Sequence, residues 1–160
     1  MDEQYFMEQA LQLAQEAACD GEVPVGCVIV RKGEIVGRGR NRRETAKTAL
    51  GHAEIEAIAQ ANKNLGGWRL WECEMYVTLE PCPMCAGAII NARIPRVVIA
   101  AKDEKCGACG SVCDLFQMEF NHHPVAEYGL LEAESQALLQ AFFRDLREKI
   151  KDRPKWKKPE

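Results

Sequence analysis

The sequence EMYVTLEPCPMCAGAIINA occupies residues 74–92 and joins a strand pattern to a helix pattern. Glu74 to Leu79 indicates a short β-strand. Pro81 then indicates the start of a helix that continues to about Ala92, because proline is favoured at the beginning of helices. The first turn of that helix carries two cysteines three positions apart. A strand that leads directly into a helix is typical of layered α/β domains.

The segments on either side extend this alternation of strands and helices. Helical spacing of apolar residues predicts helices over residues 2–19 and 52–62, and a C-terminal helix with one face formed by Leu138, Phe142, Leu146 and Ile150. Strands are predicted over residues 25–31, 34–39, 97–101 and 125–128. The first two form a hairpin across Lys32-Gly33. We therefore expect an α/β domain with a mixed sheet, in which the hairpin is antiparallel and the later strands are parallel.

Composition indicates a folded globular protein, because 47% of the 160 residues are hydrophobic, 28% are charged, and no long Pro, Ser or Gly tract interrupts them. Residues 1–153 are expected to form one domain and residues 154–160 a basic tail. No segment approaches the ~18–20 unbroken apolar residues of a membrane span, and the acidic N-terminus differs from a signal peptide. The sequence thus predicts a cytoplasmic protein with no membrane partner. Eight cysteines in a domain of this size indicate reduced thiols rather than a disulfide scaffold.

The net charge of −3 is unevenly distributed along the chain. Residues 1–30 contain six acidic residues and no Lys or Arg, whereas residues 31–47, the first basic segment, carry seven basic residues against two acidic ones. A second basic segment begins at Arg144. Such segregation either creates a local anion-binding surface or is a solvated face without a partner, and the sequence leaves both interpretations open.

Two short motifs stand at the starts of two predicted helices: His52-Ala53-Glu54, and a Cys-x-x-Cys pair formed by Cys82 and Cys85. One imidazole and two thiolates suit zinc, and three protein ligands leave a fourth position for water, as in catalytic zinc sites. A helix N-terminus favours the thiolate form. Glu54 can then take a proton from that water and pass it to a substrate nitrogen.

These motifs resemble the zinc-dependent deaminases of the cytidine and deoxycytidylate deaminase superfamily, whose pattern is H-x-E followed by P-C-x-x-C. The similarity extends to GEVPVGCVIV (21–30), GRNR (39–42), ARIPRVVIAAKDEKCGACGS (92–111) and FFRDLR (142–147). Within the superfamily it is greatest to the bacterial tRNA adenosine deaminases. The resemblance implies a three-layer α/β/α fold around a mixed sheet of about five strands. It also implies a homodimer that acts on the anticodon stem-loop of a tRNA, where zinc-activated hydroxide converts the wobble adenosine to inosine.

The same resemblance assigns roles to individual residues. His52, Cys82 and Cys85 would bind one Zn²⁺ per chain, and Glu54 would shuttle protons. Further residues would contact the substrate: Asn41 and the backbone of Ala53 holding the purine, Val23, Pro24 and Val25 forming the wall of the base pocket, and Asp103 beside the RNA strand.

Alternatives remain open at this stage. Cys106, Cys109 and Cys113 form a second cysteine run, which is either a further metal site or small residues packed in a tight loop. A deaminase of a free base or nucleotide, of the guanine or deoxycytidylate type, would use the same metal chemistry. A non-catalytic zinc- or RNA-binding module would not need Glu54. The first basic segment, Asn41 and the arginine-bearing C-terminal helix favour RNA.

Overall fold

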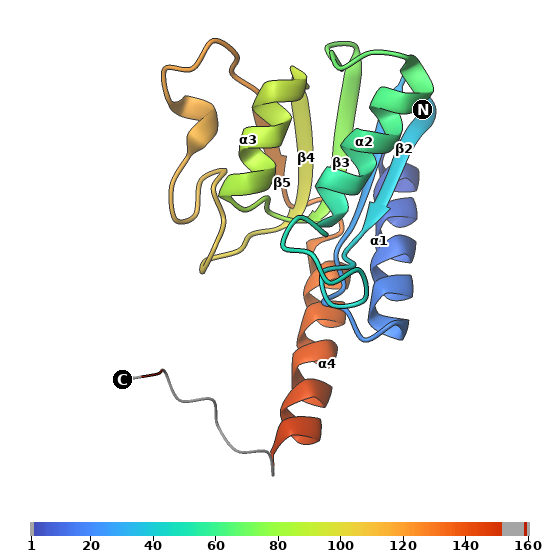
Figure 1. Cartoon of the computed structure of the whole chain (residues 1–160), viewed down its shortest axis with the longest axis vertical. Helices are drawn as coiled ribbons and strands as arrows, with labels where there is room; N and C mark the ends of the chain where they lie inside the picture. Colours follow the sequence, from blue (N-terminus) through green and yellow to red (C-terminus); the bar gives the residue numbers. More distant parts are fainter. Residues whose placement is uncertain (1, 152–158, 160) are drawn as a thin grey trace.

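The computed structural model describes residues 2–151 and residue 159 (Figure 1). Its elements are, in chain order, α1 (Glu3–Cys19), β1 (Gly26–Arg31), β2 (Glu34–Arg40), α2 (Ala53–Leu65), β3 (Cys73–Leu79), α3 (Pro83–Ala92), β4 (Arg96–Ala101), the 3₁₀ turn η1 (Leu115–Gln117), β5 (Val125–Tyr128) and α4 (Glu132–Ile150).

The five strands form one mixed sheet in the order β2-β1-β3-β4-β5. β1 pairs antiparallel with β2 and with β3, whereas β3 with β4 and β4 with β5 are parallel. The predicted α/β class, the antiparallel hairpin and the parallel later strands are therefore confirmed. Because β3 and β4 run the same way, the segments that follow them emerge at one edge of the sheet, which is where ligand sites of open α/β sheets form.

Helices cover both faces of the sheet, which confirms the three-layer arrangement (Figure 1). Alternate strand residues point to opposite faces: Cys27 and Ile29 pack with α2 and α3, and Val28 and Val30 pack with α1. Gly39 has no side chain to hold α2 away, since a Cβ there would overlap the carbonyl oxygen of Ala53. This glycine lets the start of α2 lie directly on β2.

Three local features differ from the sequence-based expectations. The helix expected to open at Pro81 begins at Pro83, with Cys82 as its N-cap in an extended conformation. The chain also forms the unpredicted turn η1. The C-terminal helix is present as α4, but Ser135 is its only buried residue among those described, and Leu146 and Ile150 on the predicted apolar face are exposed.

Within the described residues, none of the helices has the length and apolar character that crossing a membrane requires. The predicted boundary between a domain ending at residue 153 and a tail over residues 154–160 falls on residues 152–158 and 160, which lie outside the described part of the chain.

Candidate metal and substrate site

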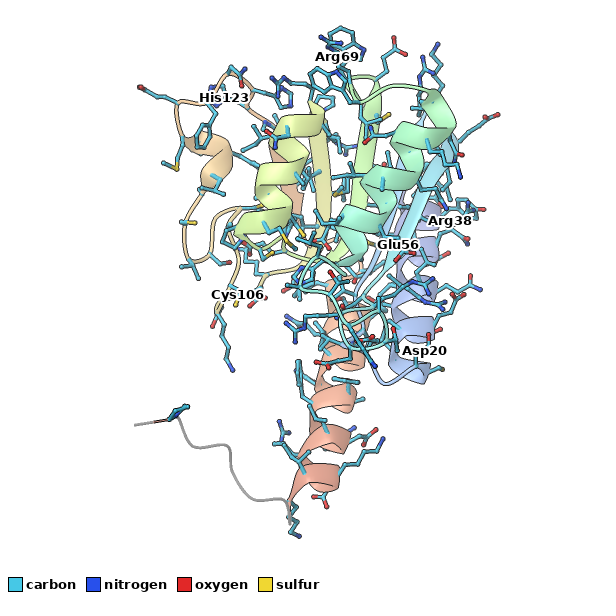
Figure 2. The ribbon with its side chains drawn as sticks, in the orientation of Figure 1. Asp20, Arg38, Glu56, Arg69, Cys106 and His123 are labelled. Atoms are coloured by element: carbon cyan, nitrogen blue, oxygen red, sulfur yellow. The ribbon has the colours of Figure 1, made fainter. Side chains whose placement is uncertain are left out.

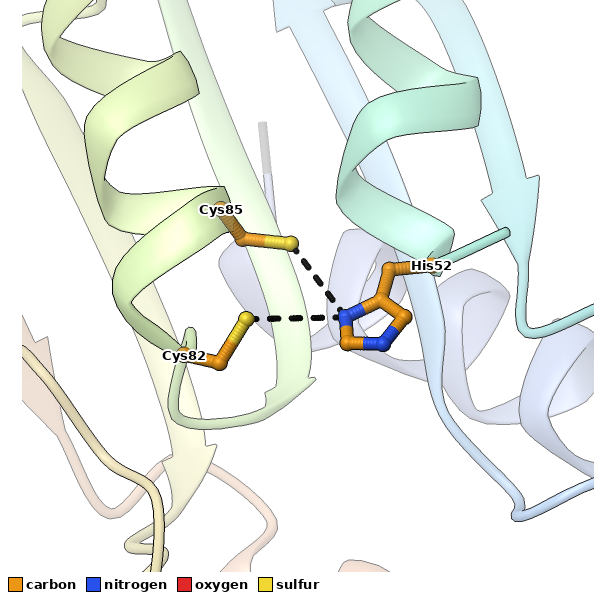
Figure 3. A group of neighbouring side chains, drawn as sticks. All are labelled: His52, Cys82 and Cys85. Atoms are coloured by element: carbon orange, nitrogen blue, oxygen red, sulfur yellow. Dashed lines mark hydrogen bonds between the residues drawn. The ribbon is translucent and has the colours of Figure 1, made fainter. Parts of the chain in front are cut away.

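The starts of α2 and α3 bring three metal-binding side chains together, as the sequence predicted (Figure 3). His52 is the N-cap of α2, Cys82 is the N-cap of α3, and Cys85 lies in the first turn of α3. Neither cap side chain accepts a hydrogen bond from its own helix. Both are therefore free to point across the gap between the two helices. Their metal-binding atoms and that of Cys85 all lie within 4.8 Å of one another.

The geometry of this group fits zinc. The Nδ1 atom of His52 lies 3.6 Å from the sulfur of Cys82 and 3.5 Å from the sulfur of Cys85. Zinc bonds of ~2.3 Å to sulfur and ~2.05 Å to nitrogen at a tetrahedral angle would separate those atoms by about 3.6 Å. The group thus has the donor types and the spacing of a Cys₂His site. One Zn²⁺ per chain belongs here, and the described residues contain no second group of this kind.

The two cysteines shift each other's pKa in opposite directions. Hydrogen bonding with Cys85, and then with His52, lowers the pKa of the Cys82 thiol to about 4, although burial opposes the shift. The same contact with Cys82, together with burial, raises the pKa of Cys85 far above its usual range. Contact with Cys82 also raises the pKa of His52. One thiolate is therefore already favoured at neutral pH, as metal binding requires.

Glu54 lies in the first turn of α2 and is 4% exposed. Burial raises the pKa of its carboxyl, against the lowering effects of its own backbone N–H, the Cys85 thiol and the charge of His52. These partners offset part of the cost of burying the carboxyl group, which also lines the cavity beside the metal group. Glu54 is therefore within reach of a molecule bound in the cavity.

A cavity of roughly 210 Å³ opens beside His52 and Glu54. Besides these two residues it is lined by Val23, Val25, Asn41, Arg43, Ala53, Leu79, Glu80, Cys82, Asp103 and Cys106. The structure thus brings all but one of the predicted substrate residues to the metal group. The exception is Pro24, which is buried and does not line the cavity.

Asn41 is more constrained than the sequence suggested. Its side-chain amide donates to the carbonyl oxygen of Val23 at 3.3 Å, and its side-chain oxygen accepts from the N–H of Arg43 at 3.1 Å. Asn41 therefore joins two walls of the cavity. One N–H and one lone pair of the amide remain for a substrate.

The sequence did not single out Glu22 and Glu80, two further buried carboxylates. Glu22 accepts hydrogen bonds from the N–H groups of Glu44 and Thr45 and from the Thr45 hydroxyl. Burial alone would raise the pKa of Glu22, but these bonds outweigh it and the pKa is lowered. Glu22 thus fixes the loop between β2 and α2. Each residue had a signal in the sequence. Glu22 directly precedes the apolar segment 23–25, and Glu80 directly follows the apolar strand β3.

The first basic segment is partly neutralised within the protein. Arg40 forms ion pairs with Glu16 at 2.5 Å and with Asp20 at 3.1 Å, and Arg42 pairs with Glu56 at 2.9 Å. Arg40, the last residue of β2, is thus joined to the C-terminal end of α1, and Arg42 joins the following loop to α2. The segment is therefore a smaller anion-binding surface than its count of basic residues predicted.

The second cysteine run does not form a metal group in the described chain. Cys106 and Cys113 are exposed, and Cys109 is buried in the core beneath α3. Cys106 lies on a loop at the same end of the sheet as the start of α3 (Figure 2). Of the two interpretations of this run, the metal site is not formed, and packing as a small residue applies to Cys109 alone.

The chain is similar to deaminases in sequence and in structure. The profile of the cytidine and deoxycytidylate deaminase zinc-binding region matches residues 1–101. A tRNA-specific adenosine deaminase of Bacillus subtilis strain 168 is 47% identical over 150 residues, which cover 93% of each chain. A solved structure from a study of A-to-I editing by tRNA:A34 deaminases superposes with a TM-score of 0.82 at 43% identity, covering 84% of this chain and 99% of that one. A guanine deaminase of Bacillus subtilis superposes with a TM-score of 0.63 at 33% identity, covering 90% of this chain and 95% of that one.

Proposed function

The chain belongs to the cytidine and deoxycytidylate deaminase family, and from that premise we propose that it is a zinc-dependent deaminase that converts adenosine to inosine at the wobble position of a tRNA anticodon. One observation carries the reaction type: three metal ligands and the buried carboxyl group of Glu54 share one cavity. The substrate follows from the relatives, because the similarity to tRNA-specific adenosine deaminases extends over nearly the full length of both chains.

The described residues supply the parts that such a reaction needs. Zinc, when bound by His52, Cys82 and Cys85, provides the Lewis acidity that activates water at neutral pH. Glu54 faces the cavity, so its carboxylate can take one proton from the attacking water and deliver it to the ring nitrogen. It can then take the second proton of that water, from the hydroxyl group now on the ring carbon, and deliver it to the departing amine. The exchange of an amino group for an oxygen releases ammonia.

The cavity walls are proposed to orient the base. The backbone N–H of Ala53 is the first of α2 and has no acceptor within the helix, so it can donate to the substrate. The free N–H and lone pair of Asn41 provide a second polar contact. Val23 and Val25 offer apolar surface to the flat ring, and Asp103 also lines the cavity.

An anticodon loop is a suitable RNA substrate because its bases are already unpaired, so little energy is needed to place one in a cavity. Arg43 lines this cavity and can contact a phosphate next to the reacting nucleoside. We also propose a homodimer in the cytoplasm, as expected from the family resemblance. Sedimentation of the purified protein would test the dimer.

A direct assay tests the substrate. The purified protein is incubated with an anticodon stem-loop that carries adenosine at the wobble position, and separately with guanine, deoxycytidylate and free adenosine. We expect inosine in the stem-loop and no comparable turnover of the small molecules. Guanine is the competing substrate to exclude, since a guanine deaminase shares this fold at 33% identity. Turnover of guanine without turnover of the stem-loop would disprove the RNA assignment.

A further inference from the structure

Glu80 occupies an unusual position for a carboxylate. It follows β3, stands two residues before the metal ligand Cys82, and is only 3% exposed. No basic side chain pairs with it among the described residues. A buried charge without a salt bridge persists only if hydrogen bonds satisfy it.

Four hydrogen bonds satisfy Glu80, and all come from the loop between β4 and η1. Its Oε1 accepts from the N–H of Asp103 at 3.2 Å and from the hydroxyl of Ser111 at 2.5 Å. Its Oε2 accepts from the N–H groups of Cys109 at 3.0 Å and Ser111 at 3.1 Å. Two carboxylate oxygens offer about four lone-pair sites, so the acceptor capacity of Glu80 is filled.

The loop is shaped around this carboxylate. A Cβ on Gly107 would overlap Oε2 of Glu80 and the carbonyl oxygen of Asp103, so the backbone approaches more closely than other residues allow. The N–H of Ala108 also donates to the carbonyl oxygen of Pro81 at 2.9 Å. The loop is therefore attached to the short segment between β3 and α3 that carries the metal ligand.

The residues that the loop carries face the substrate cavity. Asp103 and Cys106 both line it, as do Val23 and Val25. Hydrogen bonds within the loop, such as that from the N–H of Gly107 to the carbonyl oxygen of Asp103, and the burial of Ala108 and Cys109 in the core give the loop its own shape. The contacts with Glu80 and Pro81 join that shape to the segment that carries the metal ligand. Glu80 is thus placed between the metal-binding helix and one wall of the cavity.

We propose that Glu80 is a positioning residue for substrate binding: its carboxylate fixes the loop over residues 103–111 so that Asp103 and Cys106 form the cavity wall at a set distance from the metal ligands. Glu80 does not act as the acid or base, since its oxygens are occupied by protein donors. This inference rests on the proposed function, because it concerns the cavity that would receive the nucleoside.

A series of three variants tests the role. Glu80→Gln keeps the shape but turns an NH₂ group toward the N–H donors of the loop. Ser111→Ala removes one of the four hydrogen bonds, and Ser111→Thr keeps the hydroxyl. For Glu80→Gln we expect KM for the stem-loop to rise about tenfold or more with a smaller change in kcat, because wall contacts contribute to binding rather than to the chemical step. Ser111→Ala should raise KM less, and Ser111→Thr should restore it.

Two readouts separate positioning from general stability. Zinc content should remain at one ion per chain, and hydrogen–deuterium exchange should become faster in peptides over residues 103–111 of Glu80→Gln. Val98→Ala serves as the matched control, because Val98 is buried on the α1 face of the sheet, away from the cavity. It should lower the melting temperature and leave KM unchanged.

Three results would overturn the proposal: an unchanged KM in Glu80→Gln, loss of zinc in that variant, or equal KM values for Ser111→Ala and Ser111→Thr. If Glu80→Gln does not fold, the two Ser111 variants still decide. The wild-type protein is assayed first on the stem-loop and on guanine. Turnover of guanine alone refutes the proposed RNA substrate, and the same variants are then compared on guanine, so the two failures remain distinct.

Discussion

Two Cys-x-x-Cys segments of this chain share a spacing and differ in their surroundings. Cys82 and Cys85 start a helix, and the imidazole of His52 faces them from the start of a second helix at 3.5–3.6 Å. Cys106 and Cys109 lie in a loop, where one side chain is exposed and the other is buried in the apolar core.

The difference teaches that spacing alone does not make a metal site. In the first segment one helical turn directs both sulfurs to the same point, and a facing element supplies the third ligand. In the second segment the backbone rather than the sulfur is used: the N–H of Cys109 donates to Glu80, and the N–H of Cys106 donates to Asp103 at 3.2 Å. The first segment binds an ion, and the second surrounds a carboxylate.

The largest effect that would test this comparison is expected from Cys82→Ser. Serine is a poorer ligand for zinc than a thiolate, and the remaining His52 and Cys85 offer too few donors. We expect loss of bound zinc and of detectable deamination, with the fold retained because Cys82 is only half-buried. Metal analysis and circular dichroism on the same sample measure both. A variant that kept its zinc would show that the ligand set is incomplete.

A smaller effect is expected from Glu54→Gln, which leaves the ligands in place. Glutamine cannot carry the proton, and general acid–base transfer typically contributes ~10²–10⁴-fold to the rate. Turnover should fall by about that factor while zinc content stays the same. Single-turnover kinetics on the stem-loop measure the chemical step. Near wild-type rates would remove Glu54 from the proton path.

The accuracy of the sequence-based predictions depends on the range of the interaction. Strands and metal ligands follow from local spacing, and the structure confirms the elements and the His52, Cys82 and Cys85 group. The role of Glu80 depends on donors 23–31 residues away in sequence, which no local pattern records. The exposure of the apolar face of α4 could not be predicted from the sequence either. Helical spacing shows which residues share a face but not what covers that face.

The count of basic residues along a segment was the weakest predictor of an anion-binding surface, because acidic partners from distant parts of the sequence neutralise some of them. Arg40 belongs to a basic run in the sequence, yet its guanidinium is paired with Glu16 on α1 and with Asp20, the C-cap of that helix. Formal charge along a segment therefore overstates the field available to an RNA backbone.

The smallest effect is expected from the second cysteine segment. Cys106→Ser combined with Cys113→Ser should leave zinc content unchanged and turnover within a few-fold of the wild type, since both side chains are exposed and neither belongs to the metal group. Serine also preserves the size of the Cys106 side chain at the cavity wall. A fall in zinc content would mean that the second segment contributes ligands after all.

The reactivity of the thiols tests the described structure of the second cysteine segment without any substitution. Burial raises the pKa of Cys109, so this residue remains a protonated thiol at neutral pH, and because alkylation requires the thiolate it should react slowly. Cys106 and Cys113 are open to the reagent. After brief exposure of the zinc-loaded protein to iodoacetamide at neutral pH, we expect mass spectrometry to find modified Cys106 and Cys113 and unmodified Cys109. Equal labelling of Cys106 and Cys109 would show that the loop does not hold its closed form around Glu80, and the distinction between the two segments would then rest on the metal ligands alone.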